Sequence, residues 1–174
     1  MKKLAILVMC LALSAIGMSI IWNQSVYTIK SETSISSPQP TITQNELVDY
    51  QAGFAIFTNG IFRVFTLSMY HHRSEDVFID SNEPNIVRVK KRGITWGDFF
   101  RTLPLKLTDE CLTTGTGETF CTNDKDKLSF HINKAEAQTF LDQEIRDGDR
   151  VLITYGNNLK QIIDEQFQKV PSPD

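Results

Sequence analysis

The stretch Glu144–Gly156, EIRDGDRVLITYG, joins a turn to an alternating strand. Asp147 and Gly148 favour a turn, because Gly adopts positive φ freely and Asp bonds to nearby backbone groups. Apolar residues then occupy every second position, so they share one side of an extended chain. These residues are Val151, Ile153 and Tyr155. We therefore predict a strand that is entered through a tight turn and closes a sheet.

Two earlier turn signals predict hairpins. Asn59-Gly60 separates two strand-like runs within residues 54–65, FAIFTNGIFRVF, and supplies the positive φ angles of a tight hairpin. Residues 111–121, CLTTGTGETFC, form a second hairpin pattern around two glycines. NIVRVKKR (85–92) and KLSFHIN (127–133) are further strand candidates. The folded part is thus rich in strands.

Two helices are expected. Thr95 can cap a short helix that ends before Pro104, with apolar residues at i, i+3, i+4 and i+7. Those residues are Trp96, Phe99, Phe100 and Leu103. Residues 157–169, NNLKQIIDEQFQK, have an amphipathic helix pattern that places four apolar residues on one side. They are Leu159, Ile162, Ile163 and Phe167.

The N-terminal residues are typical of a membrane anchor. Residues 4–22 contain no charge, and as a helix they would extend ~28 Å, about the hydrocarbon thickness of a bilayer. Lys2 and Lys3 precede the run, which predicts a cytoplasmic N-terminus and an extracytoplasmic remainder. A cleaved signal peptide, cut between residues 15 and 19, is the alternative.

Four segments follow from these patterns. We expect a transmembrane signal anchor over residues 1–22 and a disordered Ser/Thr/Pro-rich linker over 23–45. An extracytoplasmic domain would occupy residues 46–156, and a helix and tail would occupy 157–174. The predicted fold class is α+β, with a mixed sheet and one short packed helix.

Composition restricts the function classes. The chain of 174 residues has a net charge of −3, which argues against a nucleic-acid binder, because such proteins carry a basic excess. The nucleophile-elbow, zinc-protease, phosphate-loop and dinucleotide-binding motifs are absent from the sequence. We predict no catalytic set, no bound metal and no cofactor, and we expect a non-enzymatic role.

Three stretches resemble the β-grasp, or ubiquitin-like, fold of the ThiS and MoaD sulfur carriers. FTNGIFRVF (57–65) resembles the opening hairpin, and GITWGDFFRTLPLKL (93–107) is similar to the helix segment. LSFHINKAEAQTFLDQEIRDGDRVLITYG (128–156) is similar to the last two strands. The chain also resembles a group of membrane-anchored prokaryotic proteins with a β-grasp-like outer domain. The resemblance implies a β-grasp-like mixed sheet.

The resemblance carries over a fold rather than a reaction. A sulfur carrier needs a free C-terminal Gly-Gly, whereas Gly156 is followed by Asn157 and a helix pattern. Carrier chemistry would require proteolysis that exposes Gly156. Members of the membrane-anchored group carry histidines where this chain has Gln51, Arg88 and Lys90, so the resemblance implies no metal role for these positions.

Cys111 and Cys121 flank the second hairpin. Outside the cytoplasm such a pair should oxidise, so we predict a structural disulfide. Free thiols or a redox-active pair are the alternatives. Catalytic dithiols usually lie close in sequence at a helix N-terminus, which this pair does not.

The histidines are not arranged as a metal site. His71 and His72 are adjacent, so on a strand they would point to opposite faces. The acids Glu75, Asp76 and Asp80 could join them only if a loop folded back. We interpret the pair as solvated loop residues, and His131 as an outward-facing strand residue.

A row of basic residues is the candidate binding surface. Arg88, Lys90 and Arg92 alternate, so an extended strand places them on one face, with Lys91 beside them. Such a row could attract anionic headgroups or acidic glycans. A solvated sheet face or a charged edge that blocks aggregation explains the row equally well.

The leading hypothesis is an anchored, extracytoplasmic binding or assembly module of a prokaryotic envelope. Its partners would be the membrane, through the N-terminal helix, and an envelope protein or an anionic lipid or glycan. The second hypothesis is a metal-dependent or thiol-redox envelope enzyme that uses the adjacent histidines or the cysteine pair. The third is a sulfur carrier.

Overall fold

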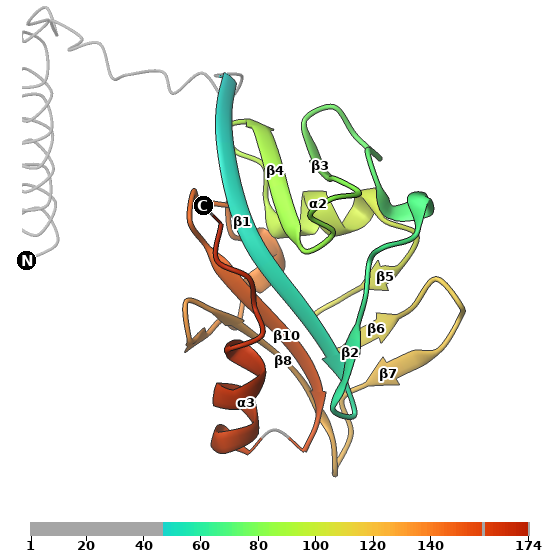
Figure 1. Cartoon of the computed structure of the whole chain (residues 1–174). Helices are drawn as coiled ribbons and strands as arrows, with labels where there is room; N and C mark the ends of the chain where they lie inside the picture. Colours follow the sequence, from blue (N-terminus) through green and yellow to red (C-terminus); the bar gives the residue numbers. More distant parts are fainter. Residues whose placement is uncertain (1–46, 158, 174) are drawn as a thin grey trace, which may run out of the picture. The chain divides into compact units, whose positions relative to one another are not determined.

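The computed structural model describes residues 47–157 and 159–173. The predicted anchor over residues 1–22 and the predicted linker over 23–45 lie outside these residues. None of the helices in the described part is both long enough and apolar enough to cross a membrane. The described residues form an α+β fold with a mixed sheet and few helices, as predicted (Figure 1).

The elements of the described part follow one another as β1 (Leu47–Thr58), β2 (Ile61–Arg63), η1 (Ser68–Tyr70), β3 (Val77–Ile79), β4 (Ile86–Lys91), α2 (Trp96–Thr102), β5 (Lys106–Leu107), β6 (Cys111–Thr113), β7 (Thr119–Cys121), β8 (Lys127–Ile132), β9 (Ala135–Glu136), η2 (Phe140–Asp142), β10 (Arg150–Gly156) and α3 (Lys160–Phe167). Seven strands form the larger sheet, in the order β3-β4-β1-β10-β8-β9 with β2 on β1. A smaller sheet has the order β5-β6-β7.

Strand β1 is the centre of the larger sheet. It runs parallel to β10, from the pair Gly53 and Arg150 to the pair Thr58 and Tyr155. Its other edge is shared, because its first half pairs with β4 and its last three residues pair with β2. The chain therefore leaves β1 through β2, makes an excursion over residues 64–85, and returns to the same edge as β4.

The turns predicted at Asn59-Gly60 and at Asp147-Gly148 are confirmed. Asn59 and Gly60 have φ angles of 50° and 77°, which is the geometry of the two-residue hairpin turn whose twist matches that of its strands. Gly148, with φ of 80°, lies in the turn that leads into β10. These turns set the register on both sides of β1.

Helix α2 begins and ends as predicted. The hydroxyl of Thr95 accepts a hydrogen bond from the Asp98 amide, and the Asp98 carboxylate accepts one from the Thr95 amide. This reciprocal capping box satisfies two amides that a helix start leaves unpaired. Burial raises the pKa of Asp98, but the Thr95 and Arg101 hydrogen bonds outweigh it and hold that pKa below its usual value.

The main core lies between the larger sheet, α2, η2 and the smaller sheet. Alternate side chains of β1 and β10 point into it, as the alternation in residues 144–156 predicts. The rings of Trp96 and Phe140 stack with their centroids 5.6 Å apart. The core members with the largest fully buried side chains are Trp96, Phe54, Phe99, Phe140, Ile56, Ile79, Leu112, Ile145 and Ile153.

Helix α3 covers the opposite face of β1 and β10. Ala55, Phe57 and Leu152 point to this face and form a second apolar cluster with Phe167 and Val170. The prediction of a C-terminal helix is confirmed, but only Ile163 and Phe167 of its four predicted apolar residues pack on this face. Leu159 precedes the first turn and is 59% exposed, and Ile162 is 36% exposed. This packing holds α3 and Val170 against β1 and β10.

The C-terminal tail lies directly against β1. A Cβ atom on Gly53 would be 2.0 Å from the carbonyl oxygen of Pro171. The guanidinium of Arg150 donates hydrogen bonds to the carbonyls of Phe167 and Val170, and it lies 5.1 Å from the centroid of the Phe167 ring. Gly53 and Arg150 thus position the segment that follows α3.

Candidate binding pocket

The predicted basic row lies on β4, where its charges face acids. Arg88 contacts Asp80 at 2.8 Å and also pairs with Glu83. The Glu83 hydrogen bond raises the pKa of Arg88, with burial acting in the opposite direction. Within the described part of the chain, the row therefore presents far less uncompensated charge than its sequence suggests.

Lys90 and Lys91 of the basic row also lie next to acidic side chains. Lys90 contacts Asp49 at 2.5 Å, and this hydrogen bond lowers the pKa of Asp49. Lys91 lies 3.5 Å from Asp76, and Arg92 is half-buried just after β4. Val87 and Val89 alternate with the basic side chains and are buried, so Arg88 and Lys90 share the face away from the main core.

The adjacent histidines have separate partners. His71 Nε2 lies 2.9 Å from the carbonyl oxygen of Phe65. His72 Nε2 lies 2.7 Å from an oxygen of Asp80, and its ring stacks on Phe78 with centroids 4.8 Å apart. Between residues 47 and 173, as far as they are described, no three His, Cys, Asp or Glu side chains gather in a way that could hold a metal ion.

His131 faces away from Phe130 and the main core, but it is not solvated. Only 5% of the residue is exposed, and its cross-strand neighbours are Leu152 on β10 and Glu136 on β9. Its Nε2 lies 3.2 Å from the Ser129 hydroxyl. Burial lowers the pKa of His131 below its ordinary value. His131 therefore points away from the main core, as predicted for an outward-facing strand residue, and it is nevertheless buried.

The Cys111–Cys121 disulfide is present. The two residues are directly opposite in the β6–β7 hairpin, with Cα atoms 4.1 Å apart. Leu112, the neighbour of Cys111, is 1% exposed and joins the main core. The disulfide therefore holds together a hairpin that packs against one end of the core.

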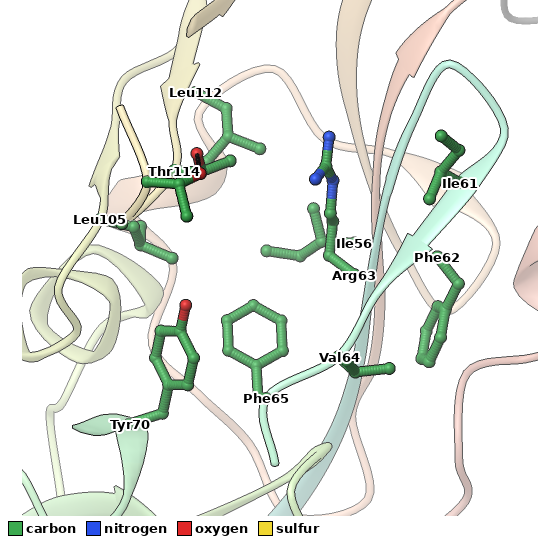
Figure 2. A pocket seen from close by; sticks show the side chains of 12 residues that line it. Ile56, Ile61, Phe62, Arg63, Val64, Phe65, Tyr70, Leu105, Leu112 and Thr114 are labelled. Carbon is green, nitrogen blue, oxygen red and sulfur yellow. Dashed lines mark hydrogen bonds between the residues drawn. The ribbon is translucent and has the colours of Figure 1, made fainter. Parts of the chain in front are cut away.

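A pocket of about 240 Å³ lies between this hairpin and the β1–β2 hairpin. Figure 2 shows Leu105, Leu112 and Thr114 on one side of the space and residues of β1 and β2 on the other. The lining is mostly apolar and consists of Ile56, Ile61, Phe62, Arg63, Val64, Phe65, Tyr70, Leu105, Leu112, Thr114, Gly115 and Thr116. The predicted basic and histidine residues contribute nothing to it.

Three separate segments position this lining. Residues 61–65 leave the tight turn as β2 and then turn inward, which buries Phe65 at 4% exposure. The short helix η1 places Tyr70 beside Phe65, with ring centroids 5.0 Å apart. Gly115 lies so close to the chain after α2 that a Cβ atom would be 2.7 Å from the Pro104 carbonyl oxygen.

Arg63 connects the two hairpins at the pocket. Its Nε donates to the Thr58 hydroxyl at 2.6 Å, and its Nη1 lies 3.1 Å from a carboxylate oxygen of Glu118. The guanidinium carbon also lies 5.2 Å from the centroid of the Phe120 ring. These contacts hold the guanidinium in one place.

Exposed apolar side chains continue from the pocket over residues 61–69. Soluble proteins rarely expose several large apolar side chains next to one another. Where such a group is exposed, it marks an interaction site. The exposed fractions are 62% for Ile61, 36% for Phe62, 60% for Val64, 61% for Leu67 and 42% for Met69. We call residues 61–69 the apolar segment.

An excess of apolar residues after the Asn59-Gly60 turn is a signal for this site in the sequence. In a half-buried strand every second residue is polar. The run IFRVFTLSM (61–69) instead has apolar residues at both parities, which is more than one buried face requires. The partner surface, which comes from residues 105–116, could not be read from the sequence because no local pattern links it to β2.

Comparisons with known proteins identified no relative. No protein-family model matches the chain, no curated protein matches it, and no solved structure matches it. The function must therefore be inferred from the chemistry of the residues themselves.

Proposed function

We propose that the chain is a membrane-anchored, extracytoplasmic binding module with a β-grasp-like fold. The parallel central strands β1 and β10, flanked by β2 and β8, support the fold assignment. The charge-free run over residues 4–22, preceded by two lysines, supports the anchor and the envelope location. The module binds an extended segment of an envelope protein, and that segment inserts one large apolar side chain into the pocket.

The pocket beside the apolar segment is the observation that carries this proposal. An apolar cavity of about 150 Å³ accommodates benzene, so about 240 Å³ accommodates an aromatic or branched side chain with some neighbouring backbone. Pockets for drug-sized ligands and cofactors have roughly 300–1,000 Å³. The size therefore favours a single side chain over a cofactor.

The free edge of β2 supports an extended partner. Among the described strands, β2 pairs only with β1. Thr58 and Ile61 close the two-residue turn as a hydrogen-bonded pair, so the next pair, Phe57 and Phe62, is not hydrogen-bonded. The Phe62 amide and carbonyl consequently point to the open side of β2, where a partner strand can pair with them.

Charge complementarity favours an apolar segment with acidic character. Residues 61–73 contain Arg63 and Arg73 and no Asp or Glu, although the whole chain has a net charge of −3. A partner segment with a carboxylate would be attracted to this part of the surface, and a basic one would be repelled.

Calorimetric titration of the full-length chain in phosphatidylcholine nanodiscs tests the proposal. The probes are two heptapeptides of Ser and Thr with one Glu, which differ only in a central Phe or Ala. Burial of a Phe side chain contributes about 1.5–3 kcal/mol, so we expect the Phe peptide to bind roughly 10-fold or more tightly than the Ala peptide.

Two exposed positions give matched variants. Val64→Asp adds a charge at the pocket and should weaken binding of the Phe peptide at least 10-fold. Leu159→Asp adds the same charge at an equally exposed apolar residue that does not line the pocket, and it should leave binding unchanged. Equal affinity for the Phe and Ala peptides, or equal effects of the two variants, would contradict the proposal.

A further inference from the structure

Arg63 is the charged residue of the pocket. The other lining residues, all in the described part of the chain, are apolar or uncharged. The Arg63 side chain keeps 28% of its surface exposed, so its guanidinium remains accessible at the edge of the cavity. A positive charge beside an apolar cavity is suited to a ligand that combines an apolar group with an anion.

Arg63 is preorganised for such a ligand. The Thr58 hydroxyl accepts a hydrogen bond from Nε, and the guanidinium carbon lies over the Phe120 ring, 5.2 Å from its centroid. A freely rotating arginine would lose side-chain entropy when a ligand binds it. Because these contacts already order Arg63 in the unbound protein, less entropy is lost on binding. Arginine also presents its donors in a planar fork that matches a carboxylate.

A carboxylate already pairs with one nitrogen of this guanidinium. Glu118, near the tip of the β6–β7 hairpin, reaches across to Arg63 Nη1 at 3.1 Å, and 55% of its side chain is exposed. Exposed ion pairs contribute only about 0–1 kcal/mol, so a second carboxylate can displace it at little cost. Glu118 shows where an anion fits, and it competes for that place.

We propose that the ligand of this pocket carries a carboxylate beside its apolar group, and that Arg63 binds this carboxylate in exchange for Glu118. The inference rests on the proposed function and adds the chemical class of the ligand. Two sources supply the same chemistry in a polypeptide: a C-terminal carboxylate after an apolar residue, and an acidic side chain next to one.

Three unlabelled hexapeptides of Ser and Thr distinguish the ligand classes by titration of the full-length chain in nanodiscs. The first ends in Phe with a free carboxylate, the second is its C-terminal amide, and the third is the amide with Glu before Phe. We expect the first or the third to bind at least 10-fold more tightly than the second, and the tighter one identifies the source.

Two substitutions should have opposite effects. Arg63→Gln should remove the preference for the carboxylate peptide. Arg146→Gln, the matched control at an exposed arginine outside both the pocket and residues 61–73, should keep it. Glu118→Gln removes the competitor, so it should strengthen binding of the carboxylate peptide about two- to five-fold and leave the amide peptide unchanged. Glu110→Gln, an exposed acid just before the same hairpin, is the control for Glu118.

The outcomes separate the two proposals. Equal binding of acid and amide peptides, or no gain in Glu118→Gln, overturns the role of Arg63 and leaves the apolar pocket standing. No binding of any Phe peptide overturns the proposed function, and this inference with it. Glu118→Gln changes an exposed side chain, so its result does not depend on how well Arg63→Gln folds.

Discussion

At the residue scale, Asp149 explains the DGD turn before the last strand. The residue is 7% exposed, and each of its carboxylate oxygens accepts a hydrogen bond. One bond comes from the Asn133 side chain at 2.9 Å and the other from the Arg146 amide at 3.0 Å. A buried carboxylate without such partners would be costly. Asp149 therefore has a structural role, which accounts for the motif without any carrier chemistry.

His131 should make stability depend on pH. Burial is the main cause that lowers its pKa in the folded chain, with a smaller opposing effect from Glu136. As pH falls below about 6.5, the unfolded histidine takes up a proton before the folded one does. The contribution of neutral His131 to the free energy of unfolding should therefore be fully present above that pH, and the free energy of unfolding should decrease as pH falls below it.

Chemical denaturation at pH 7.5 and pH 5.5 measures this effect. In His131→Gln the difference between the free energies of unfolding at the two pH values should be smaller than in the parent chain, whatever the absolute stability of the variant. His72→Gln is the control, because the side chain of His72 is 63% exposed. An unchanged pH difference in His131→Gln would show that burial of this imidazole is not linked to unfolding.

At the element scale, the β6–β7 hairpin forms one wall of the pocket. It pairs through three residue pairs between β6 and β7 and two between β5 and β6. It reaches the main sheet through the Phe120–Tyr155 ring contact at 5.4 Å and the Arg63–Glu118 ion pair. Since four lining residues come from Leu112 to Thr116, the shape of the pocket depends on this hairpin.

The disulfide should stabilise this hairpin measurably. Cys111 and Cys121 are separated by 10 positions, and closing a loop of that length contributes ~2.5–3 kcal/mol in the chain-entropy account. The double variant Cys111→Ser/Cys121→Ser should lose up to about that much unfolding free energy in urea titrations. Cys10→Ser keeps the disulfide and should match the parent chain. A double variant as stable as the parent would contradict the predicted contribution.

At the scale of the whole molecule, the central strands β1 and β10 of the larger sheet are covered on both faces. The main core with α2 lies on one face, and α3 with the C-terminal tail lies on the other. Phe57 and Leu152 would be exposed if the second cover were removed. Among the described residues after Gly156, Ile163, Phe167 and Val170 thus belong to the folded structure.

A chain that ends at Gly156 should be markedly less stable. It loses Phe167 and Val170, whose burial contributes about 1.5–3 kcal/mol each, and it leaves the apolar face of β1 and β10 in water. Thermal unfolding of this truncation and of a control that ends at Ser172 provides the comparison. Equal melting temperatures would revive the carrier hypothesis, because the C-terminal helix would then be dispensable.

The sequence by itself determined the local elements. Asn59-Gly60 dictates its turn through positive φ, Thr95 starts its helix through side-chain hydrogen bonds, and the alternation after Gly148 defines β10. Each of these depends on neighbours within a few residues, so it can be read from a short pattern. The cysteine pair belongs with them, since its hairpin is local too.

Only the tertiary structure decided the pairing of β1 with both β2 and β4, the burial of His131, and the pocket. The pocket joins residues 56–70 to residues 105–116, which meet because α2 and the core bring their chains together. Contacts of this kind depend on long-range packing, which hydrophobic periodicity does not encode. The acids of residues 76–83 that pair with Arg88 and Lys91 are near the basic row in the sequence, whereas Asp49 on β1 becomes a neighbour of Lys90 only through the β1–β4 pairing.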